Sequence, residues 1–302
     1  MRIAFVGLPL AALLLARDGH EIVWAGICRA DAIGTRRLRA MLGDRAKLVP
    51  DLGKSAAAIR AAKPDLLVSW FWTKNVPEIV RSIAPAIGVH PSLLPRHRGP
   101  DPFFWAIDRG DAETGVTAHY LDAEYDTGAM LGQKRIAIDP TWNSWTLAKK
   151  LDRPSLALLR ETVAAFARGV GGATPAGRAG AAWTPAASAQ DDALATEAPA
   201  PDDAVLEIRW QEPADAIVRR VRAASPWPGA FTEIGDAVVT VTRARATTNV
   251  PKNLAPGEAY VRDDGIAVVR AGDGGVELLA GRADDEDETP LDAAALAALV
   301  AI

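Results

Sequence analysis

The first ninety residues alternate between short apolar runs and amphipathic stretches, and this alternation constrains the fold most. The apolar runs predict strands at residues 2–6, 21–27, 47–49, 65–71 and 86–90. The stretches between them predict helices near residues 9–17, 31–42, 55–62 and 75–83. Strands that alternate with helices are typical of a doubly wound, mostly parallel sheet, so the sequence predicts an α/β fold.

Two of these predicted strands end in residues that suit a binding site. His90 is the last residue of the fifth strand, and the aromatic run Ser69-Trp70-Phe71-Trp72 ends the fourth. In doubly wound sheets the ligand crevice lies beyond the carboxyl ends of the strands. We therefore expect a site where these two strands end.

The pattern changes after His90. It predicts a short helix at residues 102–108 and then two strands, at 114–121 and 129–138. No helix fits between these strands, so we expect them to extend the sheet in an antiparallel sense. Residues 141–167 carry one long helical pattern, with Pro154 as the place where it could break.

The rest of the chain predicts a linker and a second domain. We expect an α/β domain over residues 1–168, a linker over 169–203 and a second domain over 204–302. The linker region is rich in Ala, Gly, Pro and Ser, and its Trp183 is expected to anchor it onto one domain. The last region predicts strands at 205–210, 230–233, 237–244, 258–261, 265–271 and 276–279, and helices at 213–223 and 291–302. Short, evenly spaced strands indicate a small β-barrel of the OB-like kind.

Composition and charge exclude several classes of protein. A single cysteine, Cys28, excludes an internal disulfide and a Cys-x-x-Cys metal site, and no metal is expected. It fits a cytoplasmic protein, and no run approaches the roughly 20 apolar residues of a membrane span, so no membrane partner is expected. The net charge of −4 gives no reason to expect nucleic acid. Residues 204–302 hold 10 Lys and Arg against 16 Asp and Glu, a balance that would repel phosphates.

Two segments carry the residues needed for proton transfer. The first begins at Gly88 and reads Gly-Val-His-Pro-Ser-Leu-Leu-Pro-Arg-His-Arg-Gly, so that His90 is its third residue. The second reads Asp-Thr-Gly from Asp126. A carboxylate beside an imidazole orients the ring and stabilises its charged form, so such a pair can move a proton and stabilise a negative oxygen. We expect His90 and Asp126 to form this pair on opposite sides of one crevice.

Together these motifs resemble the active site of the folate-dependent formyltransferases. The resemblance rests on His-Pro-Ser-Leu-Leu-Pro from His90, Glu-Thr-Gly-Val-Thr from Glu113, Asp-Thr-Gly from Asp126 and Pro-Trp-Pro-Gly-Ala-Phe-Thr from Pro226. It covers nearly the whole chain and implies a Rossmann-like catalytic domain followed by a small barrel. It also implies an N-formyltransferase that uses 10-formyltetrahydrofolate as donor, with His90 and Asp126 as the catalytic His and Asp.

The same resemblance implies which residues bind the donor. Its pterin would lie against the loop after the fourth strand, at Phe71, Trp72 and Thr73. On its other side it would contact the chain just before the catalytic Asp, at Leu121, Asp122, Ala123 and Glu124. Ser92 and Leu94 would belong to the loop beneath the catalytic pair. Trp70 and Trp72 are equally consistent with simple core residues.

The chain departs from the family at Gly88, where the family carries an Asn whose amide faces the developing oxyanion. Removing one such donor typically costs about 10²–10³ in rate. Four interpretations are open. Water replaces the amide while His90 stabilises the charge; the space admits a different one-carbon donor or a bulkier acceptor; Asn75 or another donor takes its place; or the protein is a non-catalytic relative that binds ligand.

By elimination, we expect the acceptor to be the primary amine of a small metabolite, such as an amino sugar, an amino acid derivative or a natural-product intermediate. Two alternatives stay open: a hydrolase that releases formate from the same donor, and a folate-binding protein without activity. The oligomeric state is open, with a homodimer among the options. His97, between two arginines, either meets an anionic group or lies in a solvated loop, and the strand pattern predicts a structural role for His119.

Overall fold

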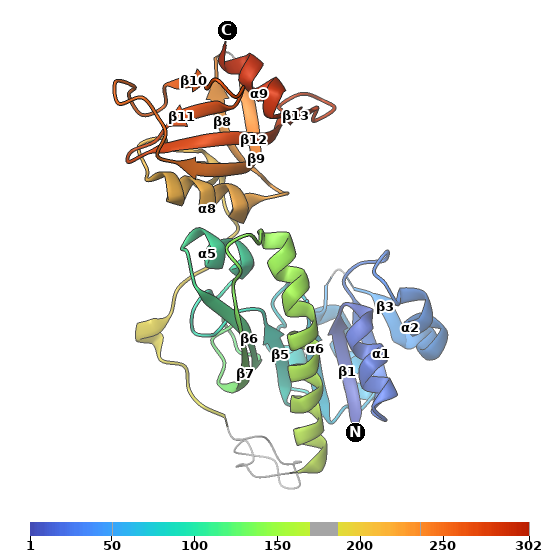
Figure 1. The fold of residues 1–302 in the computed structure, drawn as a ribbon. Coiled ribbons are helices and arrows are strands. Elements are labelled where there is room, and N and C mark those ends of the chain that lie inside the picture. Colours follow the sequence, from blue (N-terminus) through green and yellow to red (C-terminus); the bar gives the residue numbers. More distant parts are fainter. Residues whose placement is uncertain (50, 170–186, 236, 302) are drawn as a thin grey trace. The chain divides into compact units, whose positions relative to one another are not determined.

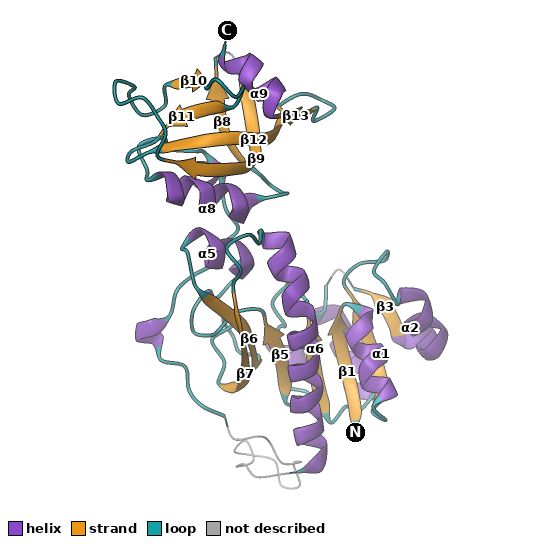
Figure 2. Cartoon of the chain, viewed as in Figure 1, coloured by secondary structure: helices purple, strands orange, loops and turns teal. Residues whose placement is uncertain are grey.

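The structure, a computed structural model, describes residues 1–49, 51–169, 187–235 and 237–301 (Figures 1 and 2). It divides into two compact units, each assembled from several stretches of chain. The first consists of Met1–Pro100, Gly115–Ile136 and Leu151–Glu197, and the second of Asp101–Thr114, Ala137–Lys150 and Ala198–Ile302. The expected domain boundaries at residues 168 and 204 stay a prediction. Residues 170–186 of the expected linker, including Trp183, lie outside the described residues.

A seven-stranded sheet in the order β3-β2-β1-β4-β5-β6-β7 forms the centre of the first unit. Its strands are β1 (Arg2–Gly7), β2 (Glu21–Ile27), β3 (Ala46–Leu48), β4 (Leu66–Trp70), β5 (Ala86–His90), β6 (Glu113–Tyr120) and β7 (Met130–Ala137). The first five pair in parallel, whereas β5 and β6 are antiparallel. The predicted α/β fold with a mostly parallel sheet is confirmed, and so is the antiparallel extension after His90.

Helices cover both faces of this sheet. They are α1 (Pro9–Arg17), α2 (Thr35–Leu42), α3 (Ala56–Ala61), α4 (Glu78–Arg81) and α6 (Ser144–Arg168), with short 3-10 turns at Gly43–Arg45 and Gly53–Ser55. Helices α3 and α4 pack with Leu67 of β4 in one core cluster. Trp70, three residues later and therefore on the opposite face, donates its indole N–H to Ser155 of α6. The strands β4 and β5 are buried throughout because both of their faces are covered.

Helix α6 runs through Pro154 without a break (Figure 1). Proline removes one backbone hydrogen bond and costs about 3 kcal/mol inside a helix. The same helix buries Leu151, Leu158 and Leu159, each of which contributes about 1.5–3 kcal/mol. Burial on the turns before and after the proline therefore outweighs the local cost.

The second unit contains a curled antiparallel sheet in the order β10-β11-β12-β9-β8, with β13 paired to β12. Its strands are β8 (Ala230–Ile234), β9 (Ala237–Thr247), β10 (Ala259–Val261), β11 (Ala267–Arg270), β12 (Gly275–Ala283) and β13 (Pro290–Asp292), and its helices are α5 (Pro102–Asp108), α7 (Asp203–Leu206), α8 (Ala214–Ala224) and α9 (Ala293–Val300). The register of β12 on β9 shifts on both sides of Ala280, and such bulges increase the twist of a sheet. The predicted OB-like barrel is confirmed.

The predicted strand at residues 205–210 is wrong. The carboxylate of Asp202 accepts a hydrogen bond from the Val205 N–H and caps the short helix α7. Only Glu207 forms an isolated bridge, with Phe231 of β8. A polar N-cap starts a helical turn more effectively than two or three apolar residues start a strand, so the cap determines the local structure.

Candidate active site

The end of β5 and the facing part of β6 bring four positions to one face of the sheet. In their antiparallel register, Gly88 lies opposite His119 and His90 lies opposite Thr117. Directly opposed residues, and residues two apart on one strand, point to the same face. The side chains of His90, Thr117 and His119 therefore share a face with the position where Gly88 has no side chain.

Both ring nitrogens of His90 have partners. Nε2 lies 2.8 Å from the carbonyl oxygen of His97, which can only accept, so Nε2 carries a hydrogen. Nδ1 lies 3.3 Å from Oδ2 of Asp126. The ring is buried, so water does not compete for these contacts. The structure thus brings the expected pair together, with Nδ1 as the nitrogen that faces the carboxylate.

Asp126 lies between two imidazole rings and a backbone donor. Its Oδ2 also accepts a hydrogen bond of 3.0 Å from the Gly99 N–H, and its Oδ1 lies 3.5 Å from Nε2 of His119. Its side chain is 16% exposed. The carboxylate is therefore held by the Gly99 N–H and partly exposed.

Three residues at this site have a backbone conformation that is unusual outside glycine. Asp126 has φ 59°, His97 has φ 58° and Phe71 has φ 52°. Each such residue costs on the order of 1–3 kcal/mol, and such residues cluster at functional sites. His97 is also buried, and its N–H donates to Oγ1 of Thr196, so the solvated-loop interpretation of this residue is wrong.

His119, predicted to be structural, is a member of this site. Its Nδ1 lies 2.8 Å from the Tyr120 carbonyl oxygen and therefore carries a hydrogen. Burial lowers the pKa of His119; the Asp126 carboxylate opposes this shift and His90 adds to it. A neutral His119 offers only a lone pair to Asp126, which leaves His90 as the ring that can share a proton with the carboxylate. His119 carries no signal in the sequence itself. Its place in the site follows from its position opposite Gly88 in the strand register.

Ser92 and Leu94 lie beneath the pair and shape its turn. The Ser92 hydroxyl donates to the Arg96 carbonyl at 2.6 Å. Oγ1 of Thr117 donates to the Ser92 carbonyl at 2.7 Å and accepts from the Leu94 N–H at 3.0 Å. Both residues are buried and hold this turn, and their contact with the donor stays a prediction.

The two segments expected to bind the donor lie next to each other. The Asn75 amide donates to the Ala123 carbonyl at 3.0 Å, which ties the loop after β4 to the loop before Asp126. Trp72 and Leu121 pack against the same core cluster. Three further residues expected at the donor are exposed, so this part of the surface is open to a ligand: Thr73, Asp122 and Glu124.

The space beside Gly88 is partly filled by Leu121. A Cβ atom placed on Gly88 would lie 3.0 Å from Cδ2 of Leu121 and 3.7 Å from Cβ of Ser69. The first contact is too close, but Cδ2 is the end of a flexible side chain and can move by a few tenths of an ångström. Asn75 is no ready substitute for the family's Asn because its amide is already bonded to Ala123.

Comparison with known proteins assigns this geometry to a family. A family model described as formyl transferase matches residues 47–163, and one described as formyl transferase, C-terminal domain, matches residues 202–298. A methionyl-tRNA formyltransferase of Anaeromyxobacter dehalogenans is 35% identical over 93% of this chain and 91% of its own length. The chain belongs to the formyl transferase family. It is therefore a transferase, as its motifs predict.

Solved structures show the same fold as this formyl transferase. HypX from Aquifex aeolicus, in complex with tetrahydrofolic acid, superposes with a TM-score of 0.66 and 20% identity over 98% of this chain. The match spans 46% of HypX, just under half of its length. An N-formyltransferase from Helicobacter canadensis, in complex with folinic acid and dTDP-3-aminofucose, gives a TM-score of 0.66 with 14% identity over 91% of this chain and 98% of its own.

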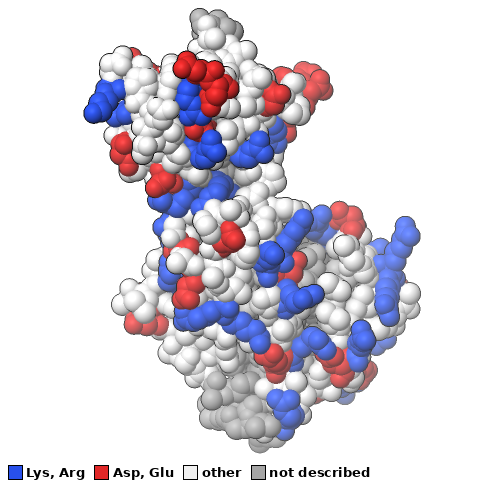
Figure 3. All heavy atoms as spheres, viewed as in Figure 1, with Lys and Arg blue, Asp and Glu red and all other residues white. Residues whose placement is uncertain are grey.

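The surface adds two observations. In the part of the chain that the structure describes, no helix has the length and apolar character needed to cross a membrane. On the face shown in Figure 3, Lys and Arg side chains are interspersed with Asp and Glu side chains on both units.

Proposed function

We propose that this enzyme transfers the formyl group of 10-formyltetrahydrofolate to a primary amine, with His90 and Asp126 at the reacting atoms. The observation that carries the proposal is the 3.3 Å contact between Nδ1 of His90 and Oδ2 of Asp126, at the strand end where the family has its active site. Formyl transferases of this family take the formyl group from this donor, which supplies it on a nitrogen that can leave.

His90 and Asp126 would share two tasks. The amine must lose a proton as it forms the new C–N bond, and negative charge develops on the formyl oxygen. Nε2 of His90 is bonded to the His97 carbonyl, so the pair would take the proton of the amine, and pass it to the leaving nitrogen of the donor, through Nδ1 and the carboxylate. In the imidazolium form the positive charge of His90 would also stabilise the negative oxygen, although both of its N–H groups already have partners. The 3.3 Å separation is long for a hydrogen bond, and such contacts tighten when substrates bind.

The residues expected to hold the donor fit a folate ring. Within the described residues, the buried indole N–H of Trp72 has no hydrogen-bond partner. A buried donor without a partner costs about 1–3 kcal/mol, which a ligand with acceptor atoms would recover. The segment at residues 122–124, which the Asn75 amide joins to the loop after β4, is exposed.

For Gly88 we propose the first of the four interpretations, in which water stands where the family has an amide. Leu121 leaves little free space beside Gly88 for a bulkier group. Asn75 is engaged elsewhere. His90 would then supply most of the oxyanion stabilisation.

The first candidate acceptor is the methionyl amine of a charged tRNA. The relative at 35% identity bears the name methionyl-tRNA formyltransferase, and the match extends over almost the whole of both chains. A pocket of about 600 Å³ in the second unit is lined by three arginines and one carboxylate, Arg222, Arg243, Arg245 and Asp215, so its charged residues are mostly basic. Phosphate groups of a nucleic acid are attracted by such a site.

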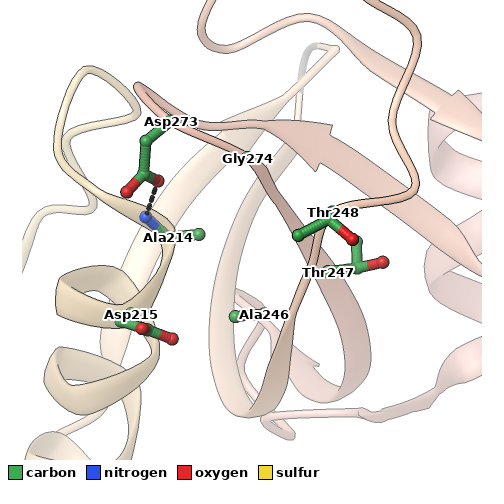
Figure 4. Close-up of a pocket in the computed structure, with 7 residues that line it drawn as sticks. All are labelled: Ala214, Asp215, Ala246, Thr247, Thr248, Asp273 and Gly274. Carbon is green, nitrogen blue, oxygen red and sulfur yellow. Dashed lines mark hydrogen bonds between the residues drawn. The ribbon is translucent and has the colours of Figure 1, made fainter.

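The second candidate is the small-molecule amine expected from the sequence. Residues 204–302 carry 16 acidic against 10 basic residues, which disfavours a polyanion. Another pocket in the second unit, of about 430 Å³, is lined by Asp215 and Asp273 (Figure 4). Asp273 accepts a hydrogen bond from the Ala214 N–H at the start of α8. These carboxylates would repel phosphate.

The two acceptors are separated by one experiment. The enzyme is incubated with 10-formyltetrahydrofolate and with methionyl-tRNA, nucleotide-linked amino sugars, free amino acids or no amine, and the products are identified by mass spectrometry. We expect one amine class to gain a formyl group, and rapid formate release without any amine would instead identify a hydrolase. Donor binding without turnover would identify an inactive relative. A cytoplasmic location stays part of this proposal.

A further inference from the structure

A segment far from the catalytic motifs in sequence, residues 187–197, lies along the active-site loops. We call it the docking segment. Its backbone pairs with β7 through two hydrogen bonds between Ser188 and Met130, of 2.8 and 2.9 Å. Near its end, the Thr196 carbonyl accepts from the Arg98 N–H at 2.8 Å. The docking segment is thus bonded to both sides of the loop region that carries His90 and Asp126.

Gln190, in the middle of the docking segment, contacts the catalytic Asp loop directly. Its amide nitrogen Nε2 donates to the carbonyl oxygen of Asp126 at 2.7 Å and to that of Gly128 at 2.8 Å. Its amide oxygen Oε1 accepts from Nε and Nη2 of Arg98, at 3.0 and 2.7 Å. All the hydrogen-bonding groups of the Gln190 side chain are therefore directed at two active-site loops.

Arg98 closes this arrangement. Its side chain is only 9% exposed, and Nη2 also contacts the Asp192 carboxylate at 2.7 Å. The next residue, Gly99, donates its N–H to Oδ2 of Asp126 at 3.0 Å. Asp126 is therefore held at its carbonyl by Gln190 and at its carboxylate by the Gly99 N–H. Arg98 links these two contacts, since it is bonded to Gln190 and precedes Gly99 in the chain.

Asp126 needs such restraint. Its φ of 59° is costly for a non-glycine residue and persists only where neighbouring groups impose it. If the loop relaxed, the carboxylate would move relative to His90. A displacement of about 1 Å from a reacting geometry can reduce a rate by about a hundredfold.

We propose that Gln190 and Arg98 are positioning residues that hold the Asp126 carboxylate against His90, and that the docking segment is part of the active site. The inference rests on the proposed function, since it assigns a role in the same reaction. Neither residue touches the reacting atoms; both act through Asp126.

Gln190→Glu separates positioning from folding. Glutamate keeps an oxygen for Arg98, and the charged pair is at least as strong as the neutral one. It loses the two hydrogen bonds to the carbonyls of Asp126 and Gly128 and places a carboxylate oxygen beside them. Arg98→Lys keeps the charge but loses the planar two-point contact with Gln190. Gln211→Glu, the same change at an exposed residue of the second unit, serves as the matched control.

We expect Gln190→Glu and Arg98→Lys to lower the melting temperature but to leave both proteins folded at the assay temperature, and to lower kcat about tenfold or more with the KM for the donor within about twofold. In an Asp126→Asn background, Gln190→Glu should cause no further loss, because the group it positions is gone. An unchanged kcat, or a loss that adds fully to that of Asp126→Asn, would overturn the proposal.

A measurement without substrate keeps the inference separate from the proposed reaction. The four histidines, His20, His90, His97 and His119, are labelled with ¹³C at the ring and followed by NMR. In Gln190→Glu we expect the His90 and His119 resonances to shift, while His20 stays fixed and Gln211→Glu changes none of them. Unchanged His90 and His119 resonances would refute positioning by Gln190. If Asp126→Asn is fully active, the proposed function is wrong. The His90 and His119 resonances then remain as the test of whether Gln190 positions Asp126.

Discussion

Asp126 is the residue on which the account of the active site depends, because it contacts two buried histidines. His119 is buried and has a lowered pKa, so at neutral pH it stays uncharged beside the carboxylate. His90 has its Nδ1 turned to Asp126 and its Nε2 bonded to a carbonyl. The Gly99 N–H therefore holds the carboxylate in place, and His90 is the ring that can share a proton with it.

The buried His119 makes stability depend on pH. In the unfolded chain His119 gains a proton below its ordinary pKa of 6.5, whereas in the folded protein it stays neutral to a lower pH. The unfolded state then binds more protons, so the stability contributed by neutral His119 is present above pH 6.5 and is lost as the pH falls below it. We expect urea unfolding to show a smaller loss of stability between about pH 7.5 and about pH 5.5 in His119→Gln than in the unmodified protein. Equal losses would contradict the lowered pKa; His20, also shifted downward, contributes equally to both proteins.

Gly88→Asn tests whether the missing amide limits the rate. The new Cβ would press on Cδ2 of Leu121, which can move, so we expect the variant to fold with a melting temperature near that of the unmodified protein. If water now stands in for the amide, the added donor should raise kcat, by about tenfold or more. A lower kcat with unchanged donor binding would instead show that the acceptor uses the space above Gly88.

Among single residues, sequence could predict His90 and Asp126 because each belongs to a compound motif. It could not predict His119 or Gln190. A histidine on an alternating strand has no local signature, and its closeness to Asp126 follows from the pairing of β6 with β5. Gln190 lies in an Ala- and Pro-rich stretch typical of a linker, and its contacts over 62 and 64 positions leave no trace in sequence.

At the scale of elements, one buried hydrogen bond joins β4 to α6. The indole N–H of Trp70, at the end of β4, donates to the Ser155 hydroxyl at 2.8 Å. Ser155→Ala leaves this donor buried without a partner, and we expect a loss of about 1–3 kcal/mol in the free energy of unfolding. In a Trp70→Phe background the same change should cost much less, and chemical denaturation of the four proteins measures the difference. Equal costs in both backgrounds would show that the bond contributes nothing.

The strands and helices also show which elements a sequence pattern is enough to predict. Strands with continuous apolar runs, such as β4 and β5, are predicted well because burial on both faces leaves an unmistakable pattern. The error at residues 205–210 arose where a single capping residue, Asp202, decides between helix and strand. Pro154 shows the opposite case, in which burial of one helix face outweighs a local helix breaker.

On the scale of the whole molecule, the second unit includes residues from the middle of the chain. Asp108, at the end of α5, forms an ion pair with Arg220 of α8, and their side chains are 10% and 16% exposed. Helix α5 therefore folds with the barrel, although it precedes β6 in sequence. The hydrophobic pattern of the sequence does not predict that α5 belongs to the second unit. Such a pattern indicates where a helix lies in the chain, but not which unit the helix packs into.

This pairing predicts a large effect at a position outside the barrel sequence. Asp108→Asn leaves Arg220 nearly buried without its counter-charge, and we expect a loss of about 3 kcal/mol or more in stability. Asp263→Asn, the same change at an exposed site of the second unit, should have almost no effect. Thermal denaturation compares the two, and a loss for Asp108→Asn as small as that for Asp263→Asn would contradict the role of the ion pair.

The central claim is that His90 and Asp126 drive formyl transfer from the folate to an amine. The most direct measurement follows a ¹³C-labelled formyl group of 10-formyltetrahydrofolate by NMR, with the accepted amine present, in the unmodified protein and in Asp126→Asn. We predict that the label moves to a formamide in the unmodified protein and that Asp126→Asn slows this by about 10²-fold or more while still binding the donor. A label that appears only as free formate, or that reaches the amine equally fast in Asp126→Asn, would contradict the account.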